Sequence, residues 1–187
     1  MTCAAIKGAA LDAIDVHILI WGLRNQLPPD PERASLPARC AKLIEKLPSP
    51  ILLPSVALGE YLIGCDPDTR DQELDEIARN YFVAPFDDKA AAIAAEIWDN
   101  KVVDRVKREA KIGKQAVKAD IQILATAIAQ GATSLYVEDR HYNNFLQDKI
   151  IIKSIPTEAE LSPQPEPKPQ KSPSAQKELF DDDGDIE

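Results

Sequence analysis

The sequence predicts an α/β fold, in which a central, mainly parallel sheet is flanked by helices and followed by a disordered C-terminal tail. Two observations carry this prediction. Short apolar runs of strand length alternate with longer segments of helical periodicity, and that order favours parallel strands joined by crossover helices. The length of 187 residues and the 44% share of hydrophobic residues suit one ordinary domain plus a tail.

The first half of the chain contains two of the expected strands. Residues 9–14 and 51–53 are short apolar runs, and prolines bound the second of them. Between and after these strands the apolar residues return at helical spacing, with one interruption by a proline-rich loop. We expect Ser55 to cap the helix after the second strand and Gly64 to end that helix. The helices expected in this half cover residues 17–24, 38–47, 56–63 and 71–80.

The second half continues the alternation of helices and strands. An Ala-rich apolar face predicts one long helix over 87–103. A later apolar stripe predicts a helix over 119–130 that stops at Gly131. A short helix is expected over 142–146. The strands expected in this half cover residues 82–84, 134–137 and 150–155.

The chain is expected to divide into a domain over 1–156 and a tail over 157–187. Six of the fifteen prolines lie from Pro156 onward, in a segment that is almost empty of large apolar residues. Such a segment cannot bury enough surface to offset the entropy lost on ordering. The tail contains nine acidic residues and three lysines, a net charge of −6.

The remaining charge is distributed unevenly along the domain. The whole chain has a net charge of −9, so subtracting the −6 of the tail leaves −3 for residues 1–156. Within the domain, residues 101–118 contain seven cations against two acids, a net charge of +5. This stretch is either a solvated helix or a phosphate-binding element. The candidate phosphate contacts are Arg105, Lys107, Arg108, Lys111 and Lys114.

Several protein classes lack support in the sequence. No run approaches the roughly 18 apolar residues of a membrane span, and the N-terminal residues do not resemble a secretory signal. Cys3, Cys40 and Cys65 are odd in number and fit no zinc spacing, so we expect reduced thiols in a cytoplasmic protein. No motif typical of dinucleotide binding, NTP binding, serine hydrolysis or zinc proteolysis is present.

Four acids stand at positions that a parallel sheet would bring together. Asp15 and Asp139 each come just after an expected strand, Glu60 lies in the helix after the second strand, and Asp120 opens the helix over 119–130. Ligand sites in such folds lie beyond the carboxyl ends of the strands. Four carboxylates gathered there would repel one another unless a cation neutralised them. Mg²⁺ is the metal ion that best suits such oxygen ligands.

Taken singly, each acid also has a simpler interpretation. Asp120 or Asp139 would stabilise the N-terminus of a helix that it opens. Glu60 would be an ordinary solvated helix residue, because glutamate is a good helix former. Asp15 is harder to explain in this way, because a carboxylate between two strongly apolar segments needs a partner.

The segments around the four acids resemble the motifs of a known family. AIDVHILIWGL, PSVALGEYLIG, KADIQILATAIAQGA and SLYVEDRHYNNF together are similar to the four acidic motifs of the PIN-domain nucleases, particularly the VapC-type toxins of bacterial toxin-antitoxin pairs. The resemblance covers residues 9–155 in family order. It implies a three-layer PIN-like sandwich and a metal-dependent ribonuclease that cleaves single-stranded or looped RNA. It also implies a homodimer that a cognate antitoxin neutralises.

The resemblance assigns roles to the four acids. Asp15, Glu60, Asp120 and Asp139 match the residues that hold Mg²⁺ or Mn²⁺ in the family. Asp15 and Asp120 are expected to bind the metal directly, Glu60 to bind it or to position water, and Asp139 to act through water. Asp12 competes with Asp15 for the first role, but the residues after Asp15 fit the motif better.

Some residues depart from the family pattern. Val16 and Val137 stand where a hydroxyl residue is usual, so two groups that support the metal ligands in the family are missing. His17 is expected to orient Asp15 by a hydrogen bond, with a general base as the alternative role. His141 is expected on the surface. Trp21 and Trp98 are expected to be core or subunit contacts.

Two alternative functions stay open at this point. The missing hydroxyls suit a catalytically degenerate PIN domain that serves as an RNA-binding or scaffold subunit. In the tail, Gln176, Leu179 and Phe180 match a pentapeptide, Q-x-x-L-F, by which bacterial replication and repair proteins bind the sliding clamp. That match would make the chain a clamp-tethered nuclease acting on DNA, whereas a plain disordered spacer is the simpler interpretation.

Overall fold

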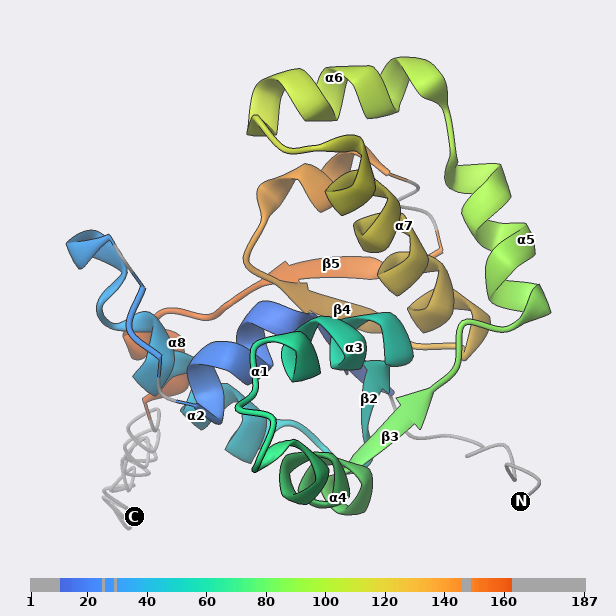
Figure 1. Cartoon of the computed structure of the whole chain (residues 1–187). Coiled ribbons are helices and arrows are strands. Elements are labelled where there is room, and N and C mark those ends of the chain that lie inside the picture. Colours follow the sequence, from blue (N-terminus) through green and yellow to red (C-terminus); the bar gives the residue numbers. More distant parts are fainter. Residues whose placement is uncertain (1–10, 25, 29, 146–148, 163–187) are drawn as a thin grey trace, which may run out of the picture.

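A five-stranded, all-parallel sheet forms the centre of the structure, a computed structural model that describes residues 11–24, 26–28, 30–145 and 149–162. The strands follow one another across the sheet in the order β3-β2-β1-β4-β5, with helices around them (Figure 1). This architecture confirms the α/β fold class. The strands are β1 (Asp12–Ile14), β2 (Ile51–Pro54), β3 (Tyr81–Ala84), β4 (Ser134–Val137) and β5 (Ile151–Ser154).

The central strand β1 is buried by its neighbours on both sides. Ala13 pairs with Leu52 of β2 and with Leu135 of β4, and all three side chains are fully buried. Apolar strands of this kind are typical of parallel sheets, because helices cover both faces. Strand β4 spans the residues that the sequence predicted.

The helices connect the strands and pack in pairs, α1 with α2 and α5 with α7. Gly131 ends α7 in the left-handed region, at a φ of 76°, as expected of a glycine stop. The α-helices are α1 (Val16–Gly22), α2 (Leu36–Lys46), α3 (Ser55–Ile63), α4 (Arg70–Asn80), α5 (Asp88–Ile97), α6 (Asn100–Ala110), α7 (Lys114–Ala129) and α8 (Glu158–Leu161); the 3₁₀ helices are η1 (Pro31–Arg33) and η2 (Arg140–Asn144).

The single long helix expected over 87–103 is wrong, because the chain forms two helices there. Helix α5 ends at Ile97, and Trp98 and Asp99 adopt extended backbone conformations before α6 begins. Asp99 caps α6 by accepting a hydrogen bond from the backbone N–H of Lys101 at 2.7 Å. The new helix therefore starts in a different direction, as Figure 1 shows.

Two expected helix starts are also wrong. Ser55 is the first residue of α3 rather than its cap, and its Oγ accepts a hydrogen bond from the backbone N–H of Phe86 at 3.2 Å. Helix α7 begins at Lys114, so Asp120 lies in its second turn instead of opening it. Asp120 therefore does not cap this helix.

The packed part of the chain continues beyond Pro156, where the sequence placed the end of the domain. Thr157 and Glu160 form a capping box that starts α8, and the side chain of Leu161 is buried. The ammonium group of Lys46 in α2 donates a hydrogen bond to the carbonyl of Leu161, so α8 is held against α2. Residues 163–187 lie outside the described part of the chain.

Cys40 and Cys65 are buried free thiols, as expected, whereas Cys3 lies outside the described residues. Burial raises the pKa of the Cys40 thiol to about 12. None of the helices in the described residues has both the length and the apolar character needed to cross a membrane.

Candidate active site

Asp15 follows β1 and begins helix α1 at the carboxyl edge of the sheet. Its side chain is buried, with 3% of its surface exposed. One carboxylate oxygen accepts a hydrogen bond from the backbone N–H of Val16 at 2.7 Å, and the other lies 3.4 Å from Nδ1 of His17. The partner that the sequence required for Asp15 is therefore a helix N-terminus together with an imidazole.

His17 makes the contact with Asp15 that the sequence predicted. The hydrogen bond to Asp15 raises the pKa of His17 to about 9 against the opposing effect of burial, and the negative charges of Asp15, Asp139 and Glu138 add to the rise. The ring is therefore an imidazolium at neutral pH. A protonated ring has no lone pair for accepting a proton, so these surroundings disfavour the general-base role.

Asp120 projects from the second turn of α7 toward helix η2. Its Oδ2 lies 2.9 Å from Nε2 of His141, and its Oδ1 accepts a hydrogen bond from the hydroxyl of Tyr142 at 3.2 Å. Burial raises the pKa of Asp120, and the charge of Asp15 raises it further, while both hydrogen bonds oppose the rise. Asp120 is thus a partly buried carboxylate whose two oxygens both have protein partners.

Glu60 lies on α3 with an exposed side chain, and its charge interacts with those of Asp15 and Asp120. Partial desolvation raises its pKa, and the negative charges of Asp15 and Asp120 raise it further. The fold therefore brings Asp15, Glu60 and Asp120 close enough for their charges to interact, although they come from the start of α1, from α3 and from α7.

Asp139 follows β4 at the N-terminus of η2. It stands at the N-cap position of η2, as the simpler interpretation expected, but its side chain makes no capping hydrogen bond. Its negative charge contributes to the raised pKa of both His17 and His141, which places Asp139 at the same edge of the sheet as the other acids. The adjacent Glu138 forms an ion pair with Arg33 at 2.9 Å.

Asp12, the competitor of Asp15, has other partners. It lies within β1, where Ser134 donates a hydrogen bond to its carboxylate and Lys153 approaches to 3.8 Å. These contacts satisfy the carboxylate inside the sheet. The structure therefore favours Asp15 over Asp12 as the acid that faces the edge.

The chemistry of the donor set suits a hard divalent cation, since the four predicted residues offer only carboxylate oxygens. Burial is the main cause of the raised pKa values of Asp120 and Glu60, and the negative charges of neighbouring acids add to the rise, so a cation would relieve that repulsion. These side chains do not form a closed set of ligands, however. Within residues 11–162, apart from the gaps in the description, no three His, Cys, Asp or Glu side chains form a group that could hold a metal ion.

His141 is not the surface residue that the sequence predicted. Only 9% of its side chain is exposed, and its ring stacks on Tyr142, with ring centroids 5.3 Å apart. Burial acts to lower the pKa of His141, but the hydrogen bond to Asp120 and the nearby carboxylates raise it overall. Sequence reasoning missed His141 and Tyr142 as partners of Asp120; the one available signal was their position directly after Asp139 and Arg140.

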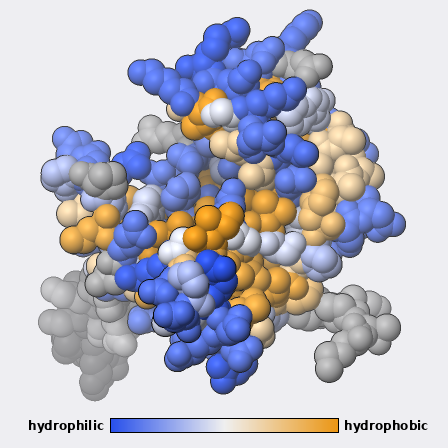
Figure 2. Space-filling view, viewed as in Figure 1, coloured by the Kyte–Doolittle hydropathy of each residue, from blue (hydrophilic) through white to orange (hydrophobic). Residues whose placement is uncertain are grey.

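The basic stretch forms α6 and the first turns of α7. Val103 and Val106 form the buried face of α6, so the cations of this helix lie on its outer face. Figure 2 shows a hydrophilic surface over this helix. Arg105 donates a hydrogen bond to Asn144 of η2 at 3.3 Å, which places the stretch beside the segment that carries His141. The other candidate phosphate contacts lie on the same stretch: Lys107, Arg108, Lys111 and Lys114.

Two further predictions concern the tryptophans and the tail. Trp21 is buried in the core, and its ring lies 5.2 Å from that of His17. Trp98 is half-buried and lines a groove between α5 and α7. The clamp-binding residues Gln176, Leu179 and Phe180 lie outside the described part of the chain.

Comparison with solved structures confirms the fold that the resemblance implied. A chain in the crystal structure of VapBC2 from Rickettsia felis bound to a DNA fragment from their promoter matches with a TM-score of 0.50 at 18% identity, covering 77% of this chain and 98% of that one. A chain of DNA-bound VapBC from Salmonella typhimurium matches with a TM-score of 0.52 at 15% identity, covering 78% and 98%. No protein-family model and no curated protein sequence matches the chain. At these identities, the likeness shows a shared fold.

Proposed function

We propose that this chain is a metal-dependent endoribonuclease and the toxin of a toxin-antitoxin pair. One observation carries the proposal: Asp15 before α1, Glu60 on α3 and Asp120 on α7 are far apart in sequence, yet their charges act on one another at the carboxyl edge of the sheet. That edge is where ligands bind in parallel α/β folds. The fold shared with chains of VapBC complexes supports the same function.

The proposed cofactor is Mg²⁺ or Mn²⁺. Asp15 and Asp120 would bind the ion directly, Glu60 would bind it or position water, and Asp139 would act through water. When bound, such an ion supplies an activated water at neutral pH and neutralises charge on the phosphate.

The protein itself contributes the orientation of the ligands. The N-terminus of α1 and the ring of His17 fix the carboxylate of Asp15. His141 and Tyr142 fix that of Asp120 from η2. These partners take the place of the hydroxyl side chains that are missing at Val16 and Val137, because they orient ligands from a second layer of contacts.

The proposed substrate is RNA in single-stranded or looped regions. Unstacked RNA exposes its phosphates and fits an open surface. The cations of α6 would bind these phosphates beside η2 and so direct the strand toward the acids. The proposed partners are a cognate antitoxin and, as the resemblance implies, a second copy of the chain.

A catalytically inactive RNA-binding or scaffold subunit is the alternative. The observation that favours it is that the described acidic side chains do not form a group that could hold a metal ion. Under this alternative, the protein would bind RNA through α6 but would show no metal-dependent cleavage.

Metal-dependent RNA cleavage separates the two functions. Purified chain, free of antitoxin, is incubated with single-stranded RNA with and without Mn²⁺ or Mg²⁺. The proposal requires cleavage that depends on the ion and is lost in Asp15→Asn, while Asp71→Asn, which removes an exposed carboxylate on α4, retains it. RNA binding without ion-dependent cleavage in the wild-type chain would leave the scaffold function, whereas equal cleavage in the two variants would mean that Asp15 is not part of the active site.

A further inference from the structure

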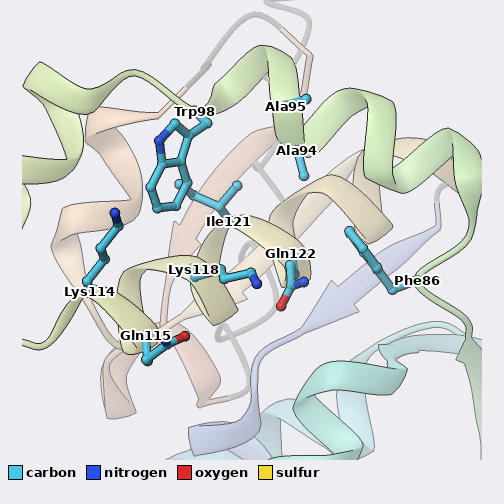
Figure 3. A pocket seen from close by; sticks show the side chains of 9 residues that line it. All are labelled: Phe86, Ala94, Ala95, Trp98, Lys114, Gln115, Lys118, Ile121 and Gln122. Carbon is cyan, nitrogen blue, oxygen red and sulfur yellow. The ribbon is translucent and has the colours of Figure 1, made fainter.

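A groove of about 630 Å³ lies between α5 and α7, away from the acids. Its floor is apolar, and Trp98 and Phe86 stand at opposite ends in Figure 3. Lys114 and Lys118 reach into it from α7. The remaining lining residues are Ala94, Ala95, Gln115, Ile121 and Gln122.

The charge of the groove is positive and is not balanced by any acid in its lining. Lys114 lies over the ring of Trp98, with Nζ 5.5 Å from the ring centroid. Within the part of the chain that the structure describes, neither Lys114 nor Lys118 forms an ion pair with an acid. A ligand that combines apolar side chains with carboxylates would therefore complement this groove.

The groove lies on the side of α7 that faces away from the candidate active site. Lys118 and Gln122 are each two residues from Asp120 in the same helix. At about 100° per residue, these side chains project roughly 200° away from Asp120. An RNA strand held at the acids would have to pass around α7 to enter the groove, so a peptide is the better occupant.

We propose that the groove binds a segment near the C-terminus of the same chain, residues 176–183. This segment carries one adjacent apolar pair, Leu179 and Phe180, followed directly by three aspartates. The apolar pair suits the floor between Trp98 and Phe86. The aspartates suit Lys114 and Lys118 at the rim.

The length of the chain beyond Ser162 allows this contact. The 16 residues between Ser162 and Leu179 span about 50 Å at roughly 3.1 Å per residue when proline-rich and extended. A domain of this size has a radius of gyration of about 15 Å and is about 40 Å across. The linker is therefore longer than the domain is wide.

Quenching of Trp98 fluorescence by acrylamide in the full-length chain tests the proposal. Phe180→Ala should make Trp98 severalfold more accessible to acrylamide, and Lys118→Gln, which leaves Lys114 in place over the ring, should shift the accessibility in the same direction. Ile186→Ala, which removes another apolar side chain of the tail, is the matched control and should change little. The same measurement in Trp98→Phe gives the contribution of the buried Trp21.

Carbodiimide cross-linking identifies the contact directly, because it joins carboxylates to lysines that touch. We expect cross-links from 181–183 to Lys114 or Lys118 within a monomer, lost in Phe180→Ala and weakened in 1 M salt, where the screening length is about 3 Å. Unchanged Trp98 quenching in Phe180→Ala would overturn the proposal, and so would cross-links found only between two copies. Protection of Trp98 by oligouridylate alone would make the groove a nucleic-acid site instead.

Discussion

Nε2 of His141 lies 2.9 Å from Oδ2 of Asp120, although 21 residues and strand β4 separate them in the chain. The neighbouring Tyr142 donates a hydrogen bond to the other oxygen of the same carboxylate. One short turn, η2, therefore holds both oxygens of an acid on α7. Pairs of this kind orient carboxylates and imidazoles around metal ions in proteins.

Removing the imidazole of His141 should weaken metal binding and RNA cleavage together. In His141→Ala the carboxylate of Asp120 loses one of the two side-chain contacts that fix its orientation, so we expect metal affinity to fall by about 10- to 100-fold. The measurement is cleavage rate as a function of Mn²⁺ concentration. Tyr142→Phe removes only the hydroxyl and keeps the ring packing, so its effect should be smaller.

A purely structural role for His141 would give a different pattern. His141→Ala would then lower the melting temperature but leave the Mn²⁺ concentration for half-maximal cleavage unchanged. Equal metal dependence in wild type and His141→Ala, with both proteins folded by circular dichroism, contradicts the positioning role.

The charge state of His17 should make stability depend on pH. Its pKa is raised to about 9 in the folded protein, from an unfolded value of about 6.5. The stabilisation that accompanies this rise is fully present below pH 6.5 and is lost as pH increases toward 9. Because the side chain is 38% exposed, solvent screening reduces its size.

NMR titration of the His17 ring checks this prediction. Asp15→Asn removes the carboxylate that accounts for most of the rise, so the pKa of His17 should fall toward its ordinary value. Added Mg²⁺ should also lower the pKa of His17, because a cation beside Asp15 offsets the negative charge that acts on the ring. A His17 ring that titrates near pH 6.5 in the metal-free wild type would contradict the interaction.

The sequence predicted the sheet well and the surroundings of the acids poorly, for a physical reason. Strand β4 has the predicted bounds, because a short apolar run between turn residues has few alternative structures. Helix periodicity continues across Trp98, so nothing in the pattern showed that Asp99 would start a new helix. The position of Asp120 along the chain was visible, whereas its contact with His141 depends on how η2 folds back after β4.

Neutralising two exposed cations of the basic stretch should reduce the salt dependence of RNA binding. Each phosphate contact to a single strand contributes roughly 0.7 to the slope of log affinity against log salt. Arg108→Gln with Lys111→Gln should therefore lower the slope by about 1.4 and weaken binding of different sequences nearly equally. Lys42→Gln with Arg79→Gln removes the same charge from α2 and α4 and should leave the slope unchanged. An equal loss in both double variants would mean that only net charge matters.

Helix α8 should contribute measurably to domain stability, in contrast to the boundary at Pro156 that the composition indicated. Leu161→Ala removes a buried side chain held against α2 and should lower the free energy of unfolding by about 2 kcal/mol. Ile63→Ala removes a similar aliphatic group that is 81% exposed, so it should change stability by less than about 0.5 kcal/mol. The check is urea denaturation. Equal midpoints for Leu161→Ala and wild type would mean that α8 does not contribute to the stability of the domain.

The assignment of the active site rests on Asp15 and Asp120, and their amide variants distinguish metal ligands from structural acids. Asparagine at position 15 can still cap α1. The amide at position 120 replaces a carboxylate whose pKa is raised by burial, so its charge is less favourable there than in water. Without metal, Asp120→Asn should be as stable as wild type or about 0.5 to 1 kcal/mol more stable. Asp15→Asn also loses the stabilising contact with His17, so it should match wild type only at a pH above about 9, where that ring is neutral. Saturating Mn²⁺ should stabilise wild type by mass action, by about 2.7 kcal/mol at 100 times Kd, and should stabilise either variant much less.

Cleavage must then be measured on the same preparations, because a variant that unfolds would also lose activity. Each amide substitution should reduce metal-dependent RNA cleavage by about two orders of magnitude or more, since the missing ligand leaves water and phosphate less polarised. Asp12→Asn changes a carboxylate held inside the sheet by Ser134, so any loss there should follow its loss of stability. If Asp15→Asn and Asp120→Asn both remain folded and cleave RNA at the wild-type rate, these acids are not metal ligands. The cleavage would then have to come from another site of the chain or from a contaminating nuclease.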